Sequence, residues 1–225
     1  MNELDFDIEL SPSVMHEMYL KQYNLQGFMH TKRGLQSPPA LASEEISHAH
    51  SLAAIYFSSC VNLEWLELQV EYEKLLKLEA ECTNSLEAQS VRRKCLDELV
   101  DVWHFSLAVL IFLGFKPEQA QKLYHFRLGA LNSLAEHVGE TSLAISKILE
   151  ATPYKTWKNQ EGIKHIDTEY ADLLFEKASV VFNSVMDFAL DCLGSSYEEF
   201  TDTYNAKNQR NFDRQVNPAH GYIGE

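Results

Sequence analysis

The chain has 225 residues, of which 45% are hydrophobic, and this is enough apolar material for one domain with a sizeable core. Glycine and proline are scarce, with nine and six residues, so an all-β fold with many tight turns is not expected. The formal net charge of −14 argues against a partner made of nucleic acid, because phosphate backbones would be repelled.

The N-terminus and the cysteines indicate a cytoplasmic protein. The first ten residues, MNELDFDIEL, are acidic and lack the basic and then apolar pattern of a signal peptide. The longest apolar stretch, near Val102–Phe115, is interrupted by His104 and is too short to span a bilayer. The four cysteines show no CxxC spacing and are typical of small core residues in a reducing compartment. We therefore expect no membrane partner.

Helical patterns follow one another along the chain and predict an all-α helical bundle with no significant sheet. The expected segments are a helix from Ser11-Pro12 to near Gly27, a loop over Thr31–Pro39, a long helix from Ser43, a polar turn over Glu79–Ser90, a helix from about Arg92 to Leu113, helices over Gln119–Val138 and Ser142–Leu149, a mobile excursion over Thr152–Asp167, a helix over Tyr170–Leu193, and a short helix from Ser196 through Lys207 followed by a polar tail. No strand-like alternation persists, and residues 1–225 are interpreted as a single domain with a mobile insertion around 150–168.

Two carboxylate pairs stand out within these helices. Glu64 and Glu67 lie three residues apart, as do Glu98 and Asp101, so each pair shares one helical face. A solvated face would tolerate such a pair. Both pairs are interleaved with apolar residues, however, and buried carboxylates are costly unless they are paired or bound to metal. If the two helices face each other, the four oxygen-bearing groups would converge and would suit Mg²⁺ or Mn²⁺. The spacing alone leaves both interpretations open.

At these residues the chain resembles the all-α dimeric dUTPase family, within the MazG-like NTP pyrophosphohydrolase superfamily. The ExxEL motif followed by ELVDVWHF marks the superfamily. The C-terminal residues Tyr204-Asn-Ala-Lys207-Asn208, then Asn211, Arg214-Gln215 and His220-Gly221-Tyr222, are similar to the more specific signature YxxKNxxNxxRQxxHGY. Together the motifs span most of the chain.

The resemblance implies a Mg²⁺-dependent enzyme, in which Mn²⁺ can substitute. Glu64, Glu67, Glu98 and Asp101 would hold the metal ions that bridge the substrate phosphates. Glu67, with Glu64 beside it, would act as the catalytic carboxylate that orients or deprotonates the attacking water. The products expected from dUTP, and from dUDP, are dUMP with pyrophosphate or phosphate.

The resemblance also assigns substrate-binding roles to the C-terminal motif. Lys207 and Arg214 would contact phosphate oxygens, the arginine in a bidentate manner. Asn208 and Asn211 would bond to the sugar or the phosphates, and Tyr222 would close over the nucleotide. Residues 204–225 would thus form a tail that closes over the substrate. The few apolar residues over 208–225 indicate that this part is mobile in the free enzyme.

The base would be recognised from two other helices. Phe105 would stack on it, and Gln22 and Gln26 would read its edge, although Gln26 stands where the family has asparagine. Two further departures are the four residues at 216–219, which lengthen the spacing before the HGY motif, and the lack of a WKxWK-like stretch within 71–81. These departures bear on the choice of base and on the phosphate contacts.

Several alternatives follow from the same residues. A dCTP or broader dNTP pyrophosphohydrolase is the nearest one. Asp101-x-x-His104 resembles half of a di-iron carboxylate site, although no second ExxH is present. A helical interaction module without activity is the non-enzymatic alternative. Apolar faces on several helices, together with the resemblance, lead us to expect a homodimer.

Overall fold

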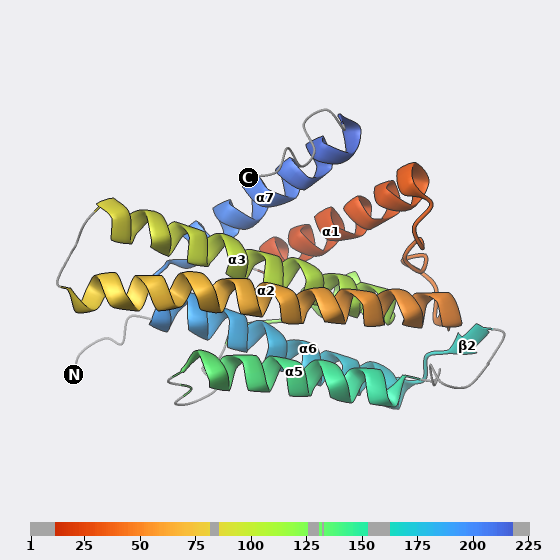
Figure 1. The fold of residues 1–225 in the computed structure, drawn as a ribbon. Helices are drawn as coiled ribbons and strands as arrows, with labels where there is room; N and C mark the ends of the chain where they lie inside the picture. The colour runs from red at the N-terminus through yellow and green to blue at the C-terminus, as the bar shows by residue number, and fades with distance from the viewer. Residues whose placement is uncertain (1–11, 82–85, 126–130, 132, 153–162, 218–225) are drawn as a thin grey trace.

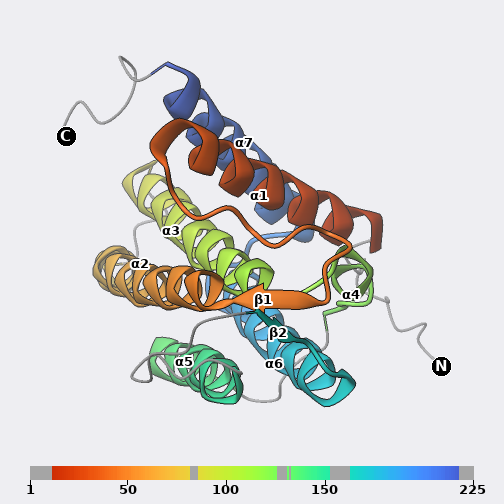
Figure 2. The same cartoon turned by 90° about the vertical axis from the view of Figure 1, so that its right-hand side faces the viewer.

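The computed structural model arranges the chain as three layers of helices (Figures 1 and 2). The structure describes residues 12–81, 86–125, 131, 133–152 and 163–217. In chain order the elements are α1 (Pro12–Arg33), β1 (Glu45–Ser47), α2 (His48–Ala80), α3 (Leu86–Phe112), α4 (Pro117–Ala120), α5 (Leu134–Ala151), β2 (Ile163–His165), α6 (Thr168–Asp187), the π-helical turn η1 (Phe188–Cys192) and α7 (Tyr197–Val216). The helices α2 and α3 form the middle layer, between the pair α1 and α7 and the pair α5 and α6 (Figure 2). The all-α prediction is confirmed.

Helix α3 lies at the centre of the hydrophobic core. From Leu99 to Phe112 nearly every one of its side chains is buried, including Trp103 and Phe112. A helix that is apolar on all sides must be covered on all sides, which is why three layers form around it. The neighbouring helix α2 is buried along one stripe that includes Trp65 and Leu68, and the rest of its surface faces away from the core.

The long helix α2 begins later than the sequence predicted. We expected it to start at Ser43, whereas Glu45–Ser47 form strand β1 and the helix starts at His48. The Ser47 side chain accepts a hydrogen bond from the backbone N–H group of His50, and His50 Nδ1 accepts one from the backbone N–H group of Ser47. This capping box fixes the start of α2.

Two short strands form the sheet that the sequence analysis missed. Glu45–Ser47 pair antiparallel with Ile163–His165, and β2 belongs to the segment predicted to be a mobile excursion. Gly114, at φ 92°, lets the chain turn directly after α3 beside Ile166. A Cβ atom at this glycine would come within 2.2 Å of the Ile166 side chain, so a larger residue would force that side chain to move and would be strained at this φ. Residues 153–162 lie outside the described part of the chain.

The connection between α3 and α5 contains less helix than expected. We predicted a helix over 119–138, but α4 ends at Ala120 and α5 begins at Leu134, where the Ser133 side chain caps the new helix. Residues 126–130 and 132 lie outside the described part. The last predicted helix of this layer is present as α6 and η1, and Gly194 at φ 62° follows it.

The outer pair, α1 and α7, is longer than predicted at both C-terminal ends. We expected α1 to stop near Gly27 and the final helix to stop at Lys207, yet they continue to Arg33 and Val216. The rings of Phe28 and Phe212, both beyond the expected ends, pack with centroids 4.7 Å apart. This contact stabilises both extensions. Its contribution exceeds the modest loss of helix stability that Gly27 causes inside α1. Helix α3 likewise starts earlier than expected, at Leu86.

In the described part of the chain, no helix combines the length and the apolar character needed to cross a membrane.

Candidate active site

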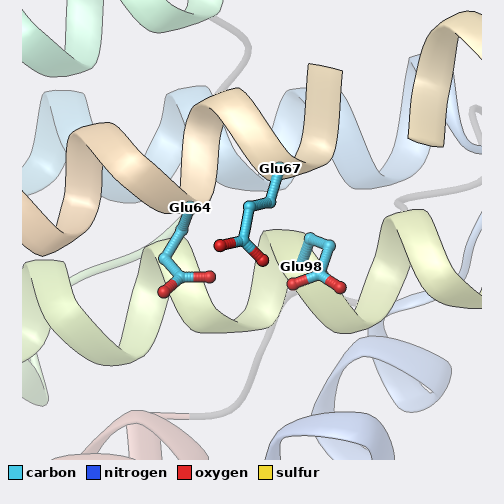
Figure 3. A group of neighbouring side chains, drawn as sticks. All are labelled: Glu64, Glu67 and Glu98. Atoms are coloured by element: carbon cyan, nitrogen blue, oxygen red, sulfur yellow. The ribbon is translucent and has the colours of Figure 1, made fainter. Parts of the chain in front are cut away.

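Three glutamates from the two central helices meet between α2 and α3 (Figure 3). Glu64 and Glu67 project from α2 and Glu98 from α3, and one carboxylate oxygen of each lies within 4.8 Å of those of the other two. Trp65 and Leu68, the residues that follow the two α2 glutamates, are buried in the core and fix the rotation of α2. The glutamates therefore stand at the edge of the core, facing α3. Helical spacing on two facing helices is what brings them together.

The fourth predicted carboxylate, Asp101, has a different partner. It lies one turn after Glu98 but falls outside the three-glutamate group, and its Oδ2 forms an ion pair with Lys207 Nζ of α7. The same ammonium group donates a hydrogen bond to the Asp97 carbonyl oxygen at 2.8 Å. One turn further along α7, Arg210 Nη2 lies 3.1 Å from Asp97 Oδ1. The structure thus brings three of the four carboxylates together and joins the fourth to the C-terminal motif.

The carboxylate cluster carries more negative charge than the neighbouring Lys207 ammonium group can neutralise. Burial, together with the neighbouring carboxylates of Asp101, Glu67 and Glu98, raises the pKa of Glu64 to about 8. Burial also raises the pKa of Glu98 and of Asp101, although the Lys207 ammonium opposes both shifts. At neutral pH the cluster therefore holds a proton in the absence of other cations. All three ligand groups are hard carboxylate oxygens, so the donor set fits Mg²⁺ or Mn²⁺.

His104 lies beside Asp101, and we expected no nucleotide-binding role for it from the sequence. Its ring is buried between α3 and α7, and Nδ1 lies 3.0 Å from the Val100 carbonyl oxygen and 3.7 Å from Asp101 Oδ1. Burial and the nearby Lys207 lower its pKa to about 3, so the ring is neutral. Because Nδ1 donates to the carbonyl group, Nε2 is left as a buried acceptor, and it has no partner. In the sequence, the signal that could have identified His104 was its position three residues after Asp101, on the same helical face.

The two glutamines of α1 are buried rather than solvated. Gln22 is 2% exposed and Gln26 4%, and both follow Met18 on one face of the helix. The Met18 carbonyl oxygen accepts a hydrogen bond of 2.8 Å from the Tyr204 hydroxyl group of α7, so this face lies against α7. Gln22 Oε1 and Asn208 Nδ2 are buried atoms without a hydrogen-bond partner. Both atoms are therefore available to form a hydrogen bond with a polar ligand.

The other predicted site residues are distributed as follows. Phe105 is partly buried and packs on Phe57, with ring centroids 6.1 Å apart, so its ring forms part of the core boundary. Asn211 and Arg214 lie on the last turns of α7, in the segment that was predicted to be a tail. Arg214 lines a surface hollow of about 470 Å³ together with Arg210, Asp213, Val216 and Asn217. Tyr222 lies outside the described residues.

The di-iron alternative gains no support from the geometry. Among the residues that the structure describes, the only group of three or more side chains placed to share a metal ion consists of Glu64, Glu67 and Glu98. His104 is not a member of this group.

Comparison with known proteins agrees with the sequence motifs. A family model described as dUTPase matches residues 15–219, which is most of the chain. The match includes the glutamate cluster, His104 and the whole of α7. No curated protein and no solved structure matches the chain.

Proposed function

Because this chain belongs to the all-α dUTPase family and is therefore an enzyme that hydrolyses dUTP, we propose that it does so with Mg²⁺ at the cluster of Glu64, Glu67 and Glu98, releasing dUMP and pyrophosphate. The observation that carries the proposal is the convergence on one point of three carboxylates from two helices, of which Glu64 and Glu98 are half-buried and Glu67 is exposed. Such a group is costly to bury without a cation. We propose Mg²⁺ as the natural ion and Mn²⁺ as a substitute.

The glutamates would divide the chemistry between them. A bound divalent cation would neutralise the phosphate oxygens and the charge that develops on the leaving group. All three glutamates would hold it, Glu64 and Glu98 from half-buried positions. Glu67 is the most exposed of the three, so water can reach its carboxylate. We therefore assign to Glu67 the orientation and deprotonation of the water that attacks the α-phosphorus.

The nucleoside would lie where α1 and α3 pack against α7. Gln22 Oε1 and His104 Nε2 are buried acceptors without partners, and Asn208 Nδ2 is an unpartnered donor. Uracil carries an N–H donor at ring position 3, whereas cytosine carries a lone pair there. A buried acceptor left unpaired penalises the wrong base strongly, which favours uracil over cytosine. Gln26, buried one turn after Gln22, would take part in the same recognition.

The phosphates would extend from the nucleoside toward the cluster. Lys207 contacts Asp101 next to the cluster, and Arg214 lies two turns further along α7 on the same helical face. We propose that both bind phosphate oxygens. Attack at the α-phosphorus requires only the α- and β-phosphates to be held, so we include dUDP as a second substrate.

An apolar surface on α2 supports a homodimer. Leu52, Tyr56, Leu63, Leu66 and Val70 are all about half exposed or more, although each is large and apolar. Their spacing places them along the side of α2 that turns away from its buried stripe. A contiguous apolar surface of this kind marks an interaction site, and a second copy of α2 offers the same surface in return.

Product analysis with a panel of nucleotides tests the function. The protein is incubated in Mg²⁺ with dUTP, dUDP, dCTP or dTTP, and the products are separated by ion-exchange chromatography. We expect dUMP with pyrophosphate from dUTP, dUMP with phosphate from dUDP, and at least about a hundredfold lower kcat/KM for dCTP and dTTP. Equal kcat/KM values for dUTP and dCTP would replace the proposal with a broader dNTP pyrophosphohydrolase.

A further inference from the structure

The ion pair between Lys207 and Asp101 places a largely shielded cation beside the glutamate cluster. The two side chains are only 13% and 18% exposed, and the Lys207 ammonium is held a second time by the Asp97 carbonyl oxygen. Arg210 differs, because its side chain is 52% exposed and it pairs with the side chain of Asp97 rather than with Asp101. Ion pairs shielded from solvent are screened little by water or salt. Lys207 is therefore a strong local counter-charge for Asp101.

This contact explains why Asp101 stands apart from the glutamates. Asp101 is one helical turn from Glu98 on α3, which is the spacing that could add a fourth oxygen to the cluster. Its Oδ2 is instead directed to Lys207 of α7, and only Glu64, Glu67 and Glu98 share one point. As long as the ion pair persists, a metal ion at the cluster has three protein carboxylates available.

We propose that Lys207 is a resident counter-cation that withholds Asp101 from the metal until the nucleotide phosphates take the ammonium group over. The inference rests on the proposed function, since it takes the cluster as the metal site and polyphosphate as the ligand. The flexible lysine stem allows the ammonium group to exchange a carboxylate for a phosphate without moving α7. Metal and nucleotide then bind cooperatively.

The cooperativity has a defined physical origin. In the free protein a metal ion would meet three carboxylates and the repulsion of a nearby ammonium group. With nucleotide bound, the ammonium group would face phosphate, and Asp101 would become free to join the cluster. By linkage, the nucleotide strengthens metal binding by the same factor by which the metal strengthens nucleotide binding.

Direct measurement of Mn²⁺ binding tests the proposal without turnover. The concentration of free Mn²⁺ is measured by electron paramagnetic resonance in solutions of the full chain, with or without a non-hydrolysable dUTP analogue. We expect Lys207→Met to bind Mn²⁺ about tenfold more tightly than the wild type in the absence of nucleotide, and to gain little when the analogue is added. Lys207→Arg keeps the charge and Arg210→Met removes a charge that does not contact Asp101, so both should stay within about twofold of the wild type.

A second variant tests the position of Asp101 itself. Because Asp101 is withheld in the free protein, Asp101→Asn should change Mn²⁺ affinity by less than about threefold without nucleotide, yet abolish the gain that the analogue gives the wild type. Circular dichroism checks that each variant keeps its helical content. This variant keeps the proposal testable if Lys207→Met does not fold.

Three results would overturn the inference: unchanged or weaker Mn²⁺ binding by Lys207→Met, an equal gain with Arg210→Met, or a tenfold loss with Asp101→Asn in the absence of nucleotide. Failure of the proposed function looks different. In that case the affinity of Lys207→Met for Mn²⁺ rises as expected, but no variant, including the wild type, converts dUTP to dUMP.

Discussion

The ring of His104 stacks on the ring of Tyr204, with 4.2 Å between the centroids and 14° between the planes. The stack joins the central helix α3 to the outer helix α7. The Tyr204 hydroxyl group continues the connection by donating to the Met18 carbonyl oxygen of α1. Three helices thus meet around His104, whose buried Nε2 atom has no hydrogen-bond partner. We propose that this atom takes part in recognition of the nucleotide.

The first prediction concerns this histidine. His104→Phe keeps a ring that can stack on Tyr204 but removes Nε2, so we expect kcat/KM for dUTP to fall by about tenfold to a hundredfold while the helical content stays unchanged. Steady-state kinetics with pyrophosphate detection provides the measurement. His137→Phe is the matched control, because His137 is also buried with an unpartnered Nε2 but lies against Phe188, away from α7. An equal loss in the two variants would show that His104 has only a packing role.

The second prediction concerns the carboxylates. Replacing Glu98 with Gln removes a charged oxygen from the cluster, and we expect turnover at saturating Mg²⁺ to fall at least about a hundredfold. Asp101→Asn should have a similar effect on turnover. Asp97→Asn is the control, since this side chain pairs with Arg210 at the surface, and its variant should keep most of the activity. If Glu98→Gln turns over dUTP at a near-normal rate, the cluster is not the metal site.

The third prediction is a pH dependence caused by Glu64. The pKa of this group is raised to about 8 in the folded, metal-free protein, whereas the ordinary value is 4.5. The folded state therefore binds more protons than the unfolded state between these values, and stability without metal should decrease as pH rises from 5 to 8. A bound metal ion requires the deprotonated carboxylate, so Mg²⁺ affinity should rise over the same range.

Thermal denaturation in the presence of a chelator measures this effect. Glu64→Gln carries no titratable proton at this position, and its Tm should change less with pH between 5 and 8 than that of the wild type. Parallel curves for the two proteins over this range would contradict the assignment.

The fourth prediction concerns assembly. Leu66→Glu places a charge in the middle of the exposed apolar surface of α2, and we expect it to convert a homodimer into a monomer of about 26 kDa by light scattering. Val216→Glu is matched to it, because Val216 on α7 is 57% exposed and Leu66 is 58% exposed. The Val216 variant should remain dimeric. A wild-type chain that is monomeric at micromolar concentration would contradict the proposed homodimer.

Local spacing carried most of what could be predicted about the site. Glu64 and Glu67 share a helical face because they are three residues apart, and apolar neighbours indicated that this face approaches the core. These are properties of one helix, and a sequence displays them directly. The burial of Gln22 was not visible in the same way, because α1 is covered by helices that come much later in the chain.

Long-range contacts account for the errors. The ion pair between Lys207 and Asp101 and the packing of Phe28 on Phe212 join segments that are far apart in the chain. The second contact extends α7 beyond Lys207, so residues 208–216 are helical rather than part of a tail. The two strands were not predicted for a similar reason. Each is only three residues long, which is too short to show an alternating pattern, and their pairing joins residues 45–47 to residues 163–165. Whether residues beyond 217 close over the substrate remains a prediction.

The central claim, that three glutamates between α2 and α3 bind the Mg²⁺ on which dUTP hydrolysis depends, is tested most directly by titrating metal into metal-free protein. The chain is stripped with a chelator, supplied with saturating dUTP, and pyrophosphate release is followed as Mg²⁺ is added. We predict no release without metal and a saturable rise with Mg²⁺ that Glu98→Gln shifts to far higher concentrations. Pyrophosphate release at full rate in excess chelator, or identical titrations for the two proteins, would contradict the account.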